Sequence, residues 1–301
     1  MPNLSIAGII PAVITAYDDY GRVSPERLAP IYDFQINGGV NGLFVGGSTG
    51  EWPLLTAQER KLVAQTALDT SNGRVPVIMH ISSLLPHEVI DYAAWAQVAG
   101  VAAVSLLMPS YYTYDAEGMM RYFNAILPQV HLPVFLYNIP GNVKNALTPS
   151  LMKQLIEKYD IIAGVKDSSM DFLKLQEFAA AAPDRLFLTG NDAQVLPCLM
   201  WGGVGAISAA AGAFPEAVCR LYHHWQAGEL EAAKALQNKL MAYRAFVVSH
   251  PALAVVKEAL EYRGFVTGGL RAPLHELSRA QKDHLHALID ELALIPERSN
   301  V

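Results

Sequence analysis

Ile161-Ile-Ala-Gly-Val-Lys166-Asp-Ser-Ser-Met170 is predicted to be a short buried strand that ends on a lysine. Residues 161–165 are apolar on both faces, which is typical of a strand covered on both sides. An ammonium group is costly to bury while charged, so burial favours the free amine, a nucleophile toward carbonyl carbon. The alternative is a lysine that reaches the surface or pairs with Asp167, and the strand alone favours that alternative.

The rest of the chain changes that balance, because strand and helix patterns alternate eight times before about residue 225. Helix-start signals separate the strands: Ser24-Pro25-Glu26 supplies an N-cap and a first-turn proline, and Thr56-Ala-Gln-Glu59 is a capping box. Alternation of this kind predicts a parallel sheet, and eight units indicate a closed (β/α)8 TIM barrel of the α/β class. An open doubly wound sheet is the alternative, but no dinucleotide fingerprint follows the first strand. The strands are predicted at residues 8–15, 42–45, 75–81, 102–108, 133–138, 161–166, 187–189 and 206–208.

The barrel is expected to span residues 1–225, with a C-terminal helical extension packed on it over residues 226–301. Helical periodicity in the extension covers residues 230–249, 251–262 and 278–292. No Gly/Ser-rich linker separates the extension from the barrel, so we expect one structural unit.

Composition narrows the class of protein and of partner. The chain has 301 residues, of which 52% are hydrophobic and 17% charged, as in globular proteins. A net charge of −6 argues against a nucleic-acid or membrane partner. Two cysteines, Cys198 and Cys219, form no disulfide framework, and no His/Asp/Glu set has metal-ligand spacing. We therefore expect no metal site. No signal peptide or membrane-spanning run is recognised, so we expect a cytoplasmic protein.

Polar residues gather where the predicted strands end, which is where barrels of this type carry their active sites. The turn 46–50 combines clustered backbone amides with two hydroxyls, an arrangement that can bind a carboxylate. The same rim is expected to carry the amine of Lys166, the phenol of Tyr137 and the hydroxyls of this turn. This combination indicates an amine nucleophile with a phenolic proton relay. His80 ends the third strand and is either pocket-lining or structural. The rim residues are Ser48, Thr49, Tyr111, Tyr112, Tyr137, Asn138, Lys166, Asp192, Ile207 and Ser208.

Five short motifs follow one another along the chain: Gly47-Ser-Thr-Gly-Glu51, Tyr137-Asn-Ile-Pro140, Gly164-Val-Lys166, Gly190-Asn-Asp192 and Gly202-Gly-Val-Gly-Ala-Ile-Ser208. In these motifs, and over essentially its whole length, the chain resembles the dihydrodipicolinate synthase / N-acetylneuraminate lyase family of pyruvate-handling class I aldolases. The resemblance implies a TIM barrel in which Lys166 forms a Schiff base with a 2-oxo acid, with no metal and no diffusible cofactor. It further implies that Tyr137 is the general acid and base.

The resemblance also implies a substrate-binding set and an assembly. Ser48 would hold the substrate carboxylate and continue the proton relay to Tyr111 of a neighbouring subunit, in a homotetramer built as a dimer of dimers. Tyr112 is the alternative relay residue, and alignment with the family favours Tyr111. The full substrate-binding set is Gly47, Ser48, Thr49, Asn142, Ser168, Gly190, Asp192, Ile207 and Ser208.

Three departures from the family patterns bear on the substrate. Asn142 replaces the arginine of dihydrodipicolinate synthases, Asp167-Ser168-Ser169 replaces their Glu-Ala-Thr, and Ala193 replaces a glutamate of N-acetylneuraminate lyases. We therefore expect a lyase that releases pyruvate from a 2-keto-3-deoxy sugar acid, or from an N-acetylneuraminate-like or 4-hydroxy-2-oxo acid. The alternatives are dihydrodipicolinate synthase, a dehydratase, and a non-catalytic barrel that binds a 2-oxo acid.

Overall fold

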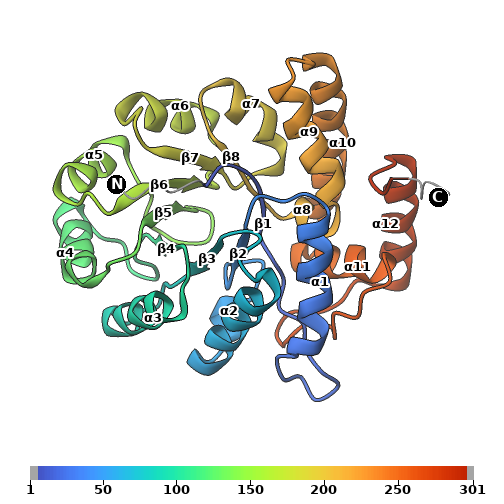
Figure 1. Ribbon diagram of the computed structural model, residues 1–301, viewed down its shortest axis with the longest axis horizontal. Coiled ribbons are helices and arrows are strands. Elements are labelled where there is room, and N and C mark those ends of the chain that lie inside the picture. The colour runs from blue at the N-terminus through green and yellow to red at the C-terminus, as the bar shows by residue number, and fades with distance from the viewer. Residues whose placement is uncertain (1–5, 297–301) are drawn as a thin grey trace.

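Eight parallel strands form a barrel in the computed structural model, which describes residues 6–296 (Figure 1). The strand order is β1-β8-β7-β6-β5-β4-β3-β2, so each strand pairs with its neighbour in sequence and β8 returns to β1. The predicted TIM barrel is confirmed. The strands are β1 (Gly8–Pro11), β2 (Leu43–Val45), β3 (Val77–His80), β4 (Ala103–Leu107), β5 (Val134–Asn138), β6 (Ile162–Asp167), β7 (Leu186–Thr189) and β8 (Gly205–Ser208).

The barrel closes between β1 and β2 through a narrow seam. A single bridge pairs Ala12 with Phe44, and the Val13 N–H donates to the Phe44 carbonyl at 3.1 Å. The first strand is shorter than the predicted 8–15, because the chain leaves the sheet after this bridge. Thr15 instead donates its hydroxyl to the Gly50 carbonyl at 2.7 Å, which fixes the loop after β2.

Helices cover the outside of the barrel and begin at the predicted signals. The Ser24 side chain accepts from the Arg27 N–H, and Thr56 and Glu59 form the predicted capping box. Thr148 and Asp171 cap the helices before and after β6. The helices are α1 (Pro25–Asn37), α2 (Ala57–Ser71), α3 (Pro86–Ala99), α4 (Ala116–Ile126), α5 (Pro149–Lys158), α6 (Phe172–Ala181), α7 (Val195–Met200) and α8 (Ala210–Ala213).

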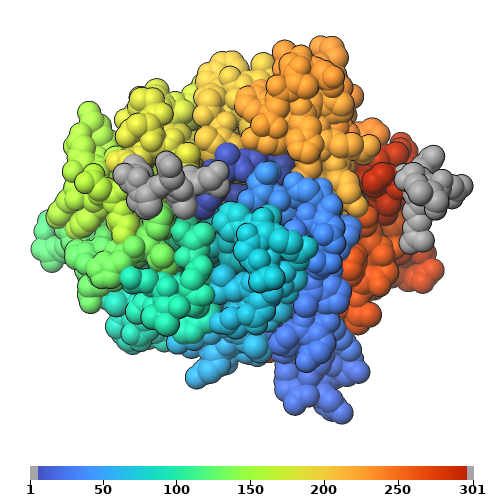
Figure 2. Space-filling model, viewed as in Figure 1, coloured from blue at the N-terminus to red at the C-terminus, as the bar shows by residue number. Residues whose placement is uncertain are grey.

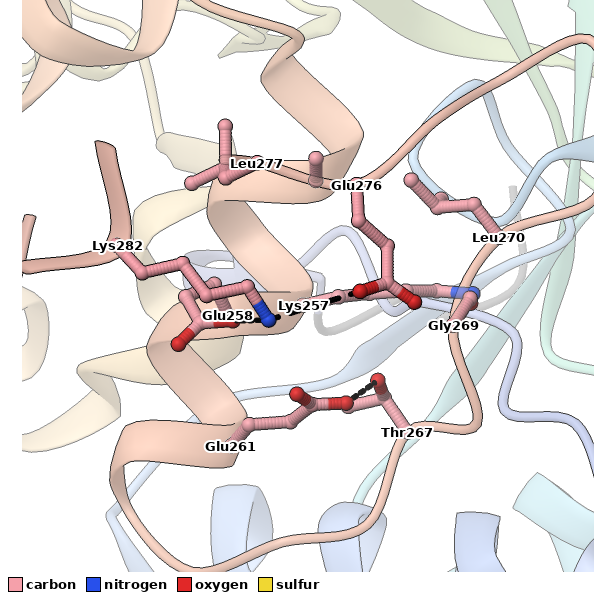
Figure 3. Close-up of a pocket in the computed structure, with 10 residues that line it drawn as sticks. Lys257, Glu258, Glu261, Thr267, Gly269, Leu270, Glu276, Leu277 and Lys282 are labelled. Atoms are coloured by element: carbon pink, nitrogen blue, oxygen red, sulfur yellow. Dashed lines mark hydrogen bonds and ion pairs between the residues drawn. The ribbon is translucent and has the colours of Figure 1, made fainter. Parts of the chain in front are cut away.

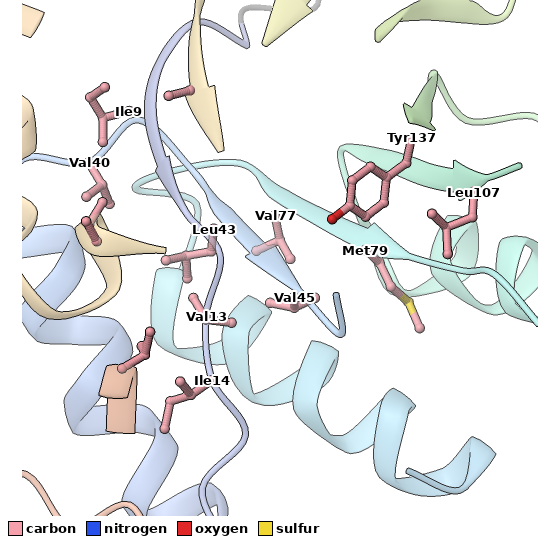
Figure 4. Packing of buried hydrophobic residues seen from close by; sticks show 14 of the residues in the cluster. Ile9, Val13, Ile14, Val40, Leu43, Val45, Val77, Met79, Leu107 and Tyr137 are labelled. Atoms are coloured by element: carbon pink, nitrogen blue, oxygen red, sulfur yellow. The ribbon is translucent and has the colours of Figure 1, made fainter. Parts of the chain in front are cut away.

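Two apolar clusters bury the strands on both faces. One fills the barrel interior and includes Phe44, Phe135, Leu188 and Ile207. The larger lies between strands and helices, and Figure 4 shows part of it around β2 and β3. Because both faces are covered, a charged side chain at a strand end is held away from water.

Four helices follow the barrel: α9 (Pro215–Gln226), α10 (Leu230–Ser249), α11 (Ala252–Tyr262) and α12 (Arg279–Glu291). The last three agree with the predicted helical stretches to within one residue. The predicted boundary at residue 225 falls in the last turn of α9, and a separate C-terminal unit stays a prediction. In Figure 2 the last helices lie beside the N-terminal part of the barrel. None of the helices in residues 6–296 is long and apolar enough to cross a membrane.

Candidate active site

Lys166 lies at the end of β6, deep inside the barrel and only 3% exposed. In the parallel register it pairs with Tyr137 of β5, so the two side chains project to the same side of the sheet. The Lys166 Nζ atom lies 3.9 Å from the Tyr137 ring centroid and 4.0 Å from that of Phe44. Burial lowers the pKa of Lys166 below the ordinary value of 10.5, while the neighbouring Tyr137 hydroxyl opposes that shift.

Asp167 does not pair with Lys166, and Lys166 does not reach the surface. The Asp167 carboxylate accepts from Asn138 Nδ2 at 2.6 Å and from Ser169 Oγ at 2.8 Å. Adjacent residues of a strand project to opposite faces, which separates the two charges. The alternative favoured by the strand alone is therefore wrong, because Asp167 has its own partners and the lysine is enclosed.

Gly190 and Ser168 border the Lys166 side chain. A Cβ atom at Gly190 would lie 3.0 Å from Lys166 Cε and 1.9 Å from Ser168 Oγ. Only glycine leaves room for the lysine and the serine together at this position. Gly190 is thus packed between the side chains of Lys166 and Ser168.

Asp192, just after β7, and Ser208, at the end of β8, are hydrogen-bonded to each other. Ser208 Oγ donates to Asp192 Oδ1 at 2.5 Å, and the Ala210 N–H donates to Asp192 Oδ2 at 3.1 Å. Burial raises the pKa of Asp192 above its ordinary value, and these hydrogen bonds oppose that shift. Ile207 packs in the barrel interior with Phe44 and Leu188. Both Asp192 oxygens are therefore engaged in joining β7 to the segment after β8.

The loop 46–51 lies against the same aromatic ring that contacts the lysine. A Cβ atom at Gly47 would lie 2.3 Å from Phe44 Cε1, so glycine allows the loop to pack on that ring. Ser48 and Thr49 follow and are half-buried. Ser48 also lines a cleft of about 860 Å³ that Tyr111, Tyr112 and Asn142 share. The structure thus brings the predicted carboxylate-binding loop and both candidate relay tyrosines to one cleft.

Tyr111 points outward rather than into its own barrel. It is 69% exposed, its φ is 77°, and its ring contacts that of Tyr112 edge-on at 4.9 Å. A bulky residue in left-handed backbone is strained, and its surroundings must hold it there. Asn145 does so by donating to the carbonyls of Pro109 and Tyr112, each at 2.7 Å. Sequence reasoning missed Asn145.

His80 is structural in its contacts. It is fully buried, and its ring lies edge-on to Tyr137 at 5.8 Å and to Trp52 at 5.4 Å. Burial holds the pKa of His80 well below 6.5, so the imidazole is neutral. Within residues 6–296, no group of three or more His, Cys, Asp or Glu side chains is arranged to hold a metal ion.

Comparison with known proteins identifies the family. A sequence model of the dihydrodipicolinate synthetase family matches residues 5–292. The chain belongs to this family. The 4-hydroxy-tetrahydrodipicolinate synthase of Methanopyrus kandleri is 33% identical over 98% of this chain and 99% of its own. Relatives of this kind indicate an enzyme of the carbon–carbon lyase class.

Two solved structures extend the comparison within the family. YagE, an E. coli K12 prophage protein of the dihydrodipicolinic acid synthase family in complex with pyruvate, has a TM-score of 0.93 and 32% identity, covering 97% of this chain and 100% of its own. A Ruminococcus gnavus sialic acid aldolase with a mutated catalytic lysine has a TM-score of 0.91 and 28% identity, covering 97% and 99%. The dihydrodipicolinate synthetase family therefore includes both synthases and aldolases, and they share this barrel fold.

In this family member the C-terminal helices hold the loop 46–51 from behind. Glu51, the last residue of the motif, is buried and pairs with Lys257 of α11 at 2.6 Å. Arg271 donates its N–H to the Glu51 carboxylate, and its guanidinium pairs with Glu59 of α2. Sequence reasoning noted Glu51 only as part of a motif. No local sequence pattern identified Lys257 and Arg271, because their partners are more than two hundred residues away in the sequence.

A charged cluster beyond Lys257 joins α11 to α12. Glu258 pairs with His286 at 2.8 Å and with Lys282 at 2.6 Å. Figure 3 shows Glu258 and Lys282 from close by. The cavity beside Lys257 has a volume of about 10 Å³, room for no more than one water molecule. The cluster is therefore structural and not an organic-ligand site.

Proposed function

We propose that this enzyme is a class I aldolase acting in the retro-aldol direction. Lys166 forms a Schiff base with a 2-oxo acid, and the enzyme cleaves a 2-keto-3-deoxy sugar acid, or a similar 4-hydroxy-2-oxo or N-acetylneuraminate-like acid, to pyruvate and an aldehyde. The observation that carries the proposal is the buried Lys166 amine with a lowered pKa beside the Tyr137 phenol. A free amine next to a proton donor is what imine formation needs.

The chemistry follows from these two side chains. The Lys166 amine attacks the C2 carbonyl to give a carbinolamine. The Tyr137 phenol donates its proton to the departing hydroxyl, which leaves as water, so that a protonated imine and the Tyr137 phenolate form. Tyr137, as phenolate, takes the C4 hydroxyl proton, the C3–C4 bond breaks, and its electron pair moves into the imine to give an enamine. The aldehyde departs, C3 takes a proton, and water releases pyruvate from Lys166. This sequence of steps needs no metal and no other cofactor.

The loop 46–51 has the chemistry to hold the substrate carboxylate through Gly47, Ser48 and Thr49. Ser168 and Gly190 would border the imine, and Ile207 would lie against its apolar side. Asp192 and Ser208 would keep that wall in place. Asn142 takes the position of a carboxylate-binding arginine, which disfavours lysine biosynthesis as the role of this enzyme.

We also propose a homotetramer in which Tyr111 enters a neighbouring active site. Tyr111, Tyr112 and Leu84 are exposed and line one cleft, which supports a first interface. Leu173 and Trp201 are exposed on another part of the surface, where Trp201 contacts Phe172, and support a second. Two such surfaces are what a dimer of dimers requires.

The alternatives share the lysine. Dihydrodipicolinate synthase would condense pyruvate with aspartate semialdehyde, as the name of the Methanopyrus relative suggests. A dehydratase would expel water from the same imine and keep the carbon chain intact, so product analysis separates it from a lyase. A non-catalytic barrel would bind a 2-oxo acid without turnover.

Borohydride trapping tests the proposal. Incubation with pyruvate and borohydride, followed by peptide mass spectrometry, is expected to give a reduced adduct on Lys166. Lys153, an exposed lysine on α5, is the internal control and should stay unmodified. A folded protein with no adduct on Lys166 would overturn the Schiff-base mechanism.

A further inference from the structure

Helix α10 returns from the far end of the barrel to the rim that carries the active site. It is joined to α9 by a short turn, so the two helices are antiparallel neighbours (Figure 1). Midway along it, the buried Gln237 donates from Nε2 to the Asp192 carbonyl at 2.8 Å and accepts from the Leu196 N–H at 2.8 Å. One face of α10 is thereby fixed against the turn that carries Asp192.

Arg244 lies on that same face, closer to the rim. It follows Gln237 by seven residues, which is two helical turns or about 10 Å along the axis. Its Nη2 atom lies 3.1 Å from the sulfur of Met170. Met170 comes four residues after Lys166 and has left-handed backbone, with a φ of 63°. Arg244 therefore reaches the loop that begins at the candidate nucleophile.

The contact that the structure shows for the Arg244 guanidinium is with a sulfur atom and not with a carboxylate. A thioether is a weak acceptor, and Arg244 makes no ion pair with a carboxylate in the part of the chain that the structure describes. Asp171, next to Met170, uses its carboxylate to cap α6 through the N–H groups of Leu173 and Lys174. Within residues 6–296, an arginine with five donors thus faces the active-site rim without a carboxylate in ion-pair distance.

The charge of Arg244 also acts on the active site. Burial raises the pKa of Asp192, and after the hydrogen bonds from Ser208 and Ala210 the charge of Arg244 opposes that shift. The field of this arginine therefore extends to the wall formed by β7 and β8. That wall begins beside the candidate nucleophile, because Gly190 borders the Lys166 side chain and precedes Asp192 by two residues.

We infer that Arg244 binds a second anionic group, a carboxylate or a phosphate, on the aldehyde half of the substrate. This inference rests on the proposed aldolase function and names its substrate class. Guanidinium groups bind both anions through paired hydrogen bonds. Asn142 has no charge with which to bind such a group, so the structure offers Arg244, on a different element, for this role.

The experiment compares three aldehydes of equal carbon number as acceptors for pyruvate. Glyceraldehyde is uncharged, tartronate semialdehyde carries a carboxylate, and glyceraldehyde 3-phosphate carries a phosphate. The enzyme is expected to prefer one anionic acceptor over glyceraldehyde by roughly 10- to 100-fold in kcat/KM, as a charged hydrogen-bonded pair gives. The preferred acceptor identifies the anion as carboxylate or phosphate.

Substitutions test whether Arg244 is the residue that causes the preference for an anionic acceptor. Arg244→Gln should raise KM for the preferred anionic acceptor at least 10-fold, with kcat nearly unchanged and glyceraldehyde unaffected. Arg244→Lys should keep part of the preference. Arg220→Gln, which removes an exposed arginine of α9, is the matched control and should behave as wild type. Equal losses for neutral and anionic acceptors in Arg244→Gln, or no anionic preference in the wild type, would overturn the inference.

Borohydride trapping separates this inference from the proposed function. The pyruvate adduct on Lys166 should form equally in the wild type and in Arg244→Gln. An adduct without anionic preference overturns only the role of Arg244, whereas no adduct in the wild type overturns the mechanism and this inference together.

Discussion

The carboxylate of Glu51 lies 2.6 Å from the ammonium of Lys257, and both side chains are buried. Glu51 has left-handed backbone, with a φ of 59°, and ends the loop that holds Ser48 and Thr49. Burial lowers the pKa of Lys257, and the charge of Glu51 opposes that shift. The pair therefore fixes the loop 46–51 to α11, and each buried charge depends on the other.

Lys257→Met should lower the free energy of unfolding by roughly 3–5 kcal/mol, because it leaves the buried Glu51 carboxylate without its ion-pair partner. Adding Glu51→Gln should recover part of that loss. Urea denaturation of the two single variants and the double variant measures the coupling. Kinetics should show a rise in KM for pyruvate in Lys257→Met. Strictly additive losses would mean that the two charges do not depend on each other.

Tyr137→Phe should lower kcat by roughly 10²-fold or more, because it removes the proton donor and acceptor. The phenyl ring still contacts Lys166, so the borohydride adduct with pyruvate should still form, but more slowly, because Tyr137 no longer supplies a proton for imine formation. Tyr159→Phe, on a tyrosine whose hydroxyl bonds to Asn124, is the control and should keep normal kcat. An unchanged kcat in Tyr137→Phe would remove the proton relay from the mechanism.

Gly190→Ala should abolish most of the activity, because its Cβ atom would displace Ser168 and press on the Lys166 side chain. A thermal melt and the rate of adduct formation measure the effect. Gly141→Ala is the matched control, since a Cβ atom there meets no other atom within 4 Å. If Gly190→Ala forms the adduct at the normal rate, the lysine side chain does not need that space.

Much of the fold was predictable because local signals agreed with the alternation of strands and helices. The caps at Ser24 and Thr56 are formed by adjacent residues, and their helices start where predicted. The first strand was predicted too long, because its apolar pattern continues after the chain has crossed to β2. Periodicity reports burial, and the segment after Pro11 is buried without being a strand.

The site was predictable only in part, and the reason is sequence distance. Lys166 and Tyr137 are recognisable because each ends a strand, and parallel strands bring their carboxyl ends together. Gln237, Arg244 and Lys257 lie inside helices, where a polar residue usually faces solvent. Their partners are decided by how the C-terminal helices pack against the barrel, and periodicity does not specify that packing.

The rate of adduct formation should rise with pH, because only the unprotonated Lys166 amine attacks a carbonyl. Burial lowers the pKa of Lys166, so the midpoint of the rise should fall below 10.5. Initial rates of trapping with pyruvate, measured over a range of pH, give this midpoint. A midpoint at or above 10.5 would show that the amine is no more reactive than a surface lysine.

The protein should lose stability in acid because protonation of Glu59 breaks its ion pair with Arg271. The hydrogen bond from Arg271 lowers the pKa of Glu59 from 4.5 to about 2. A lowered carboxyl pKa stabilises the fold above about pH 4.5, and this contribution is lost as the pH falls toward 2. The loss should be roughly 1 kcal/mol, because the pair is partly exposed.

Glu59→Gln tests this dependence. Urea denaturation between pH 5 and 2.5 should show a shallower decline in the variant than in the wild type. Glu157→Gln removes the partner of the exposed Lys153 at 3.8 Å and should leave the decline unchanged. Parallel curves for Glu59→Gln and the wild type would mean that Glu59 is not the group that titrates.

The order of synthesis gives the anchoring of Glu51 a further consequence. Arg271 follows Glu51 by 220 residues, and ribosomes add about 5–20 residues per second, so the two are separated by roughly 10–45 s. In the later part of that interval the nascent chain already contains Lys166 and Tyr137, while the loop 46–51 still lacks its contacts with Lys257 and Arg271. The chain must therefore be synthesised beyond α11 before the loop proposed to hold the substrate carboxylate has all of its anchors.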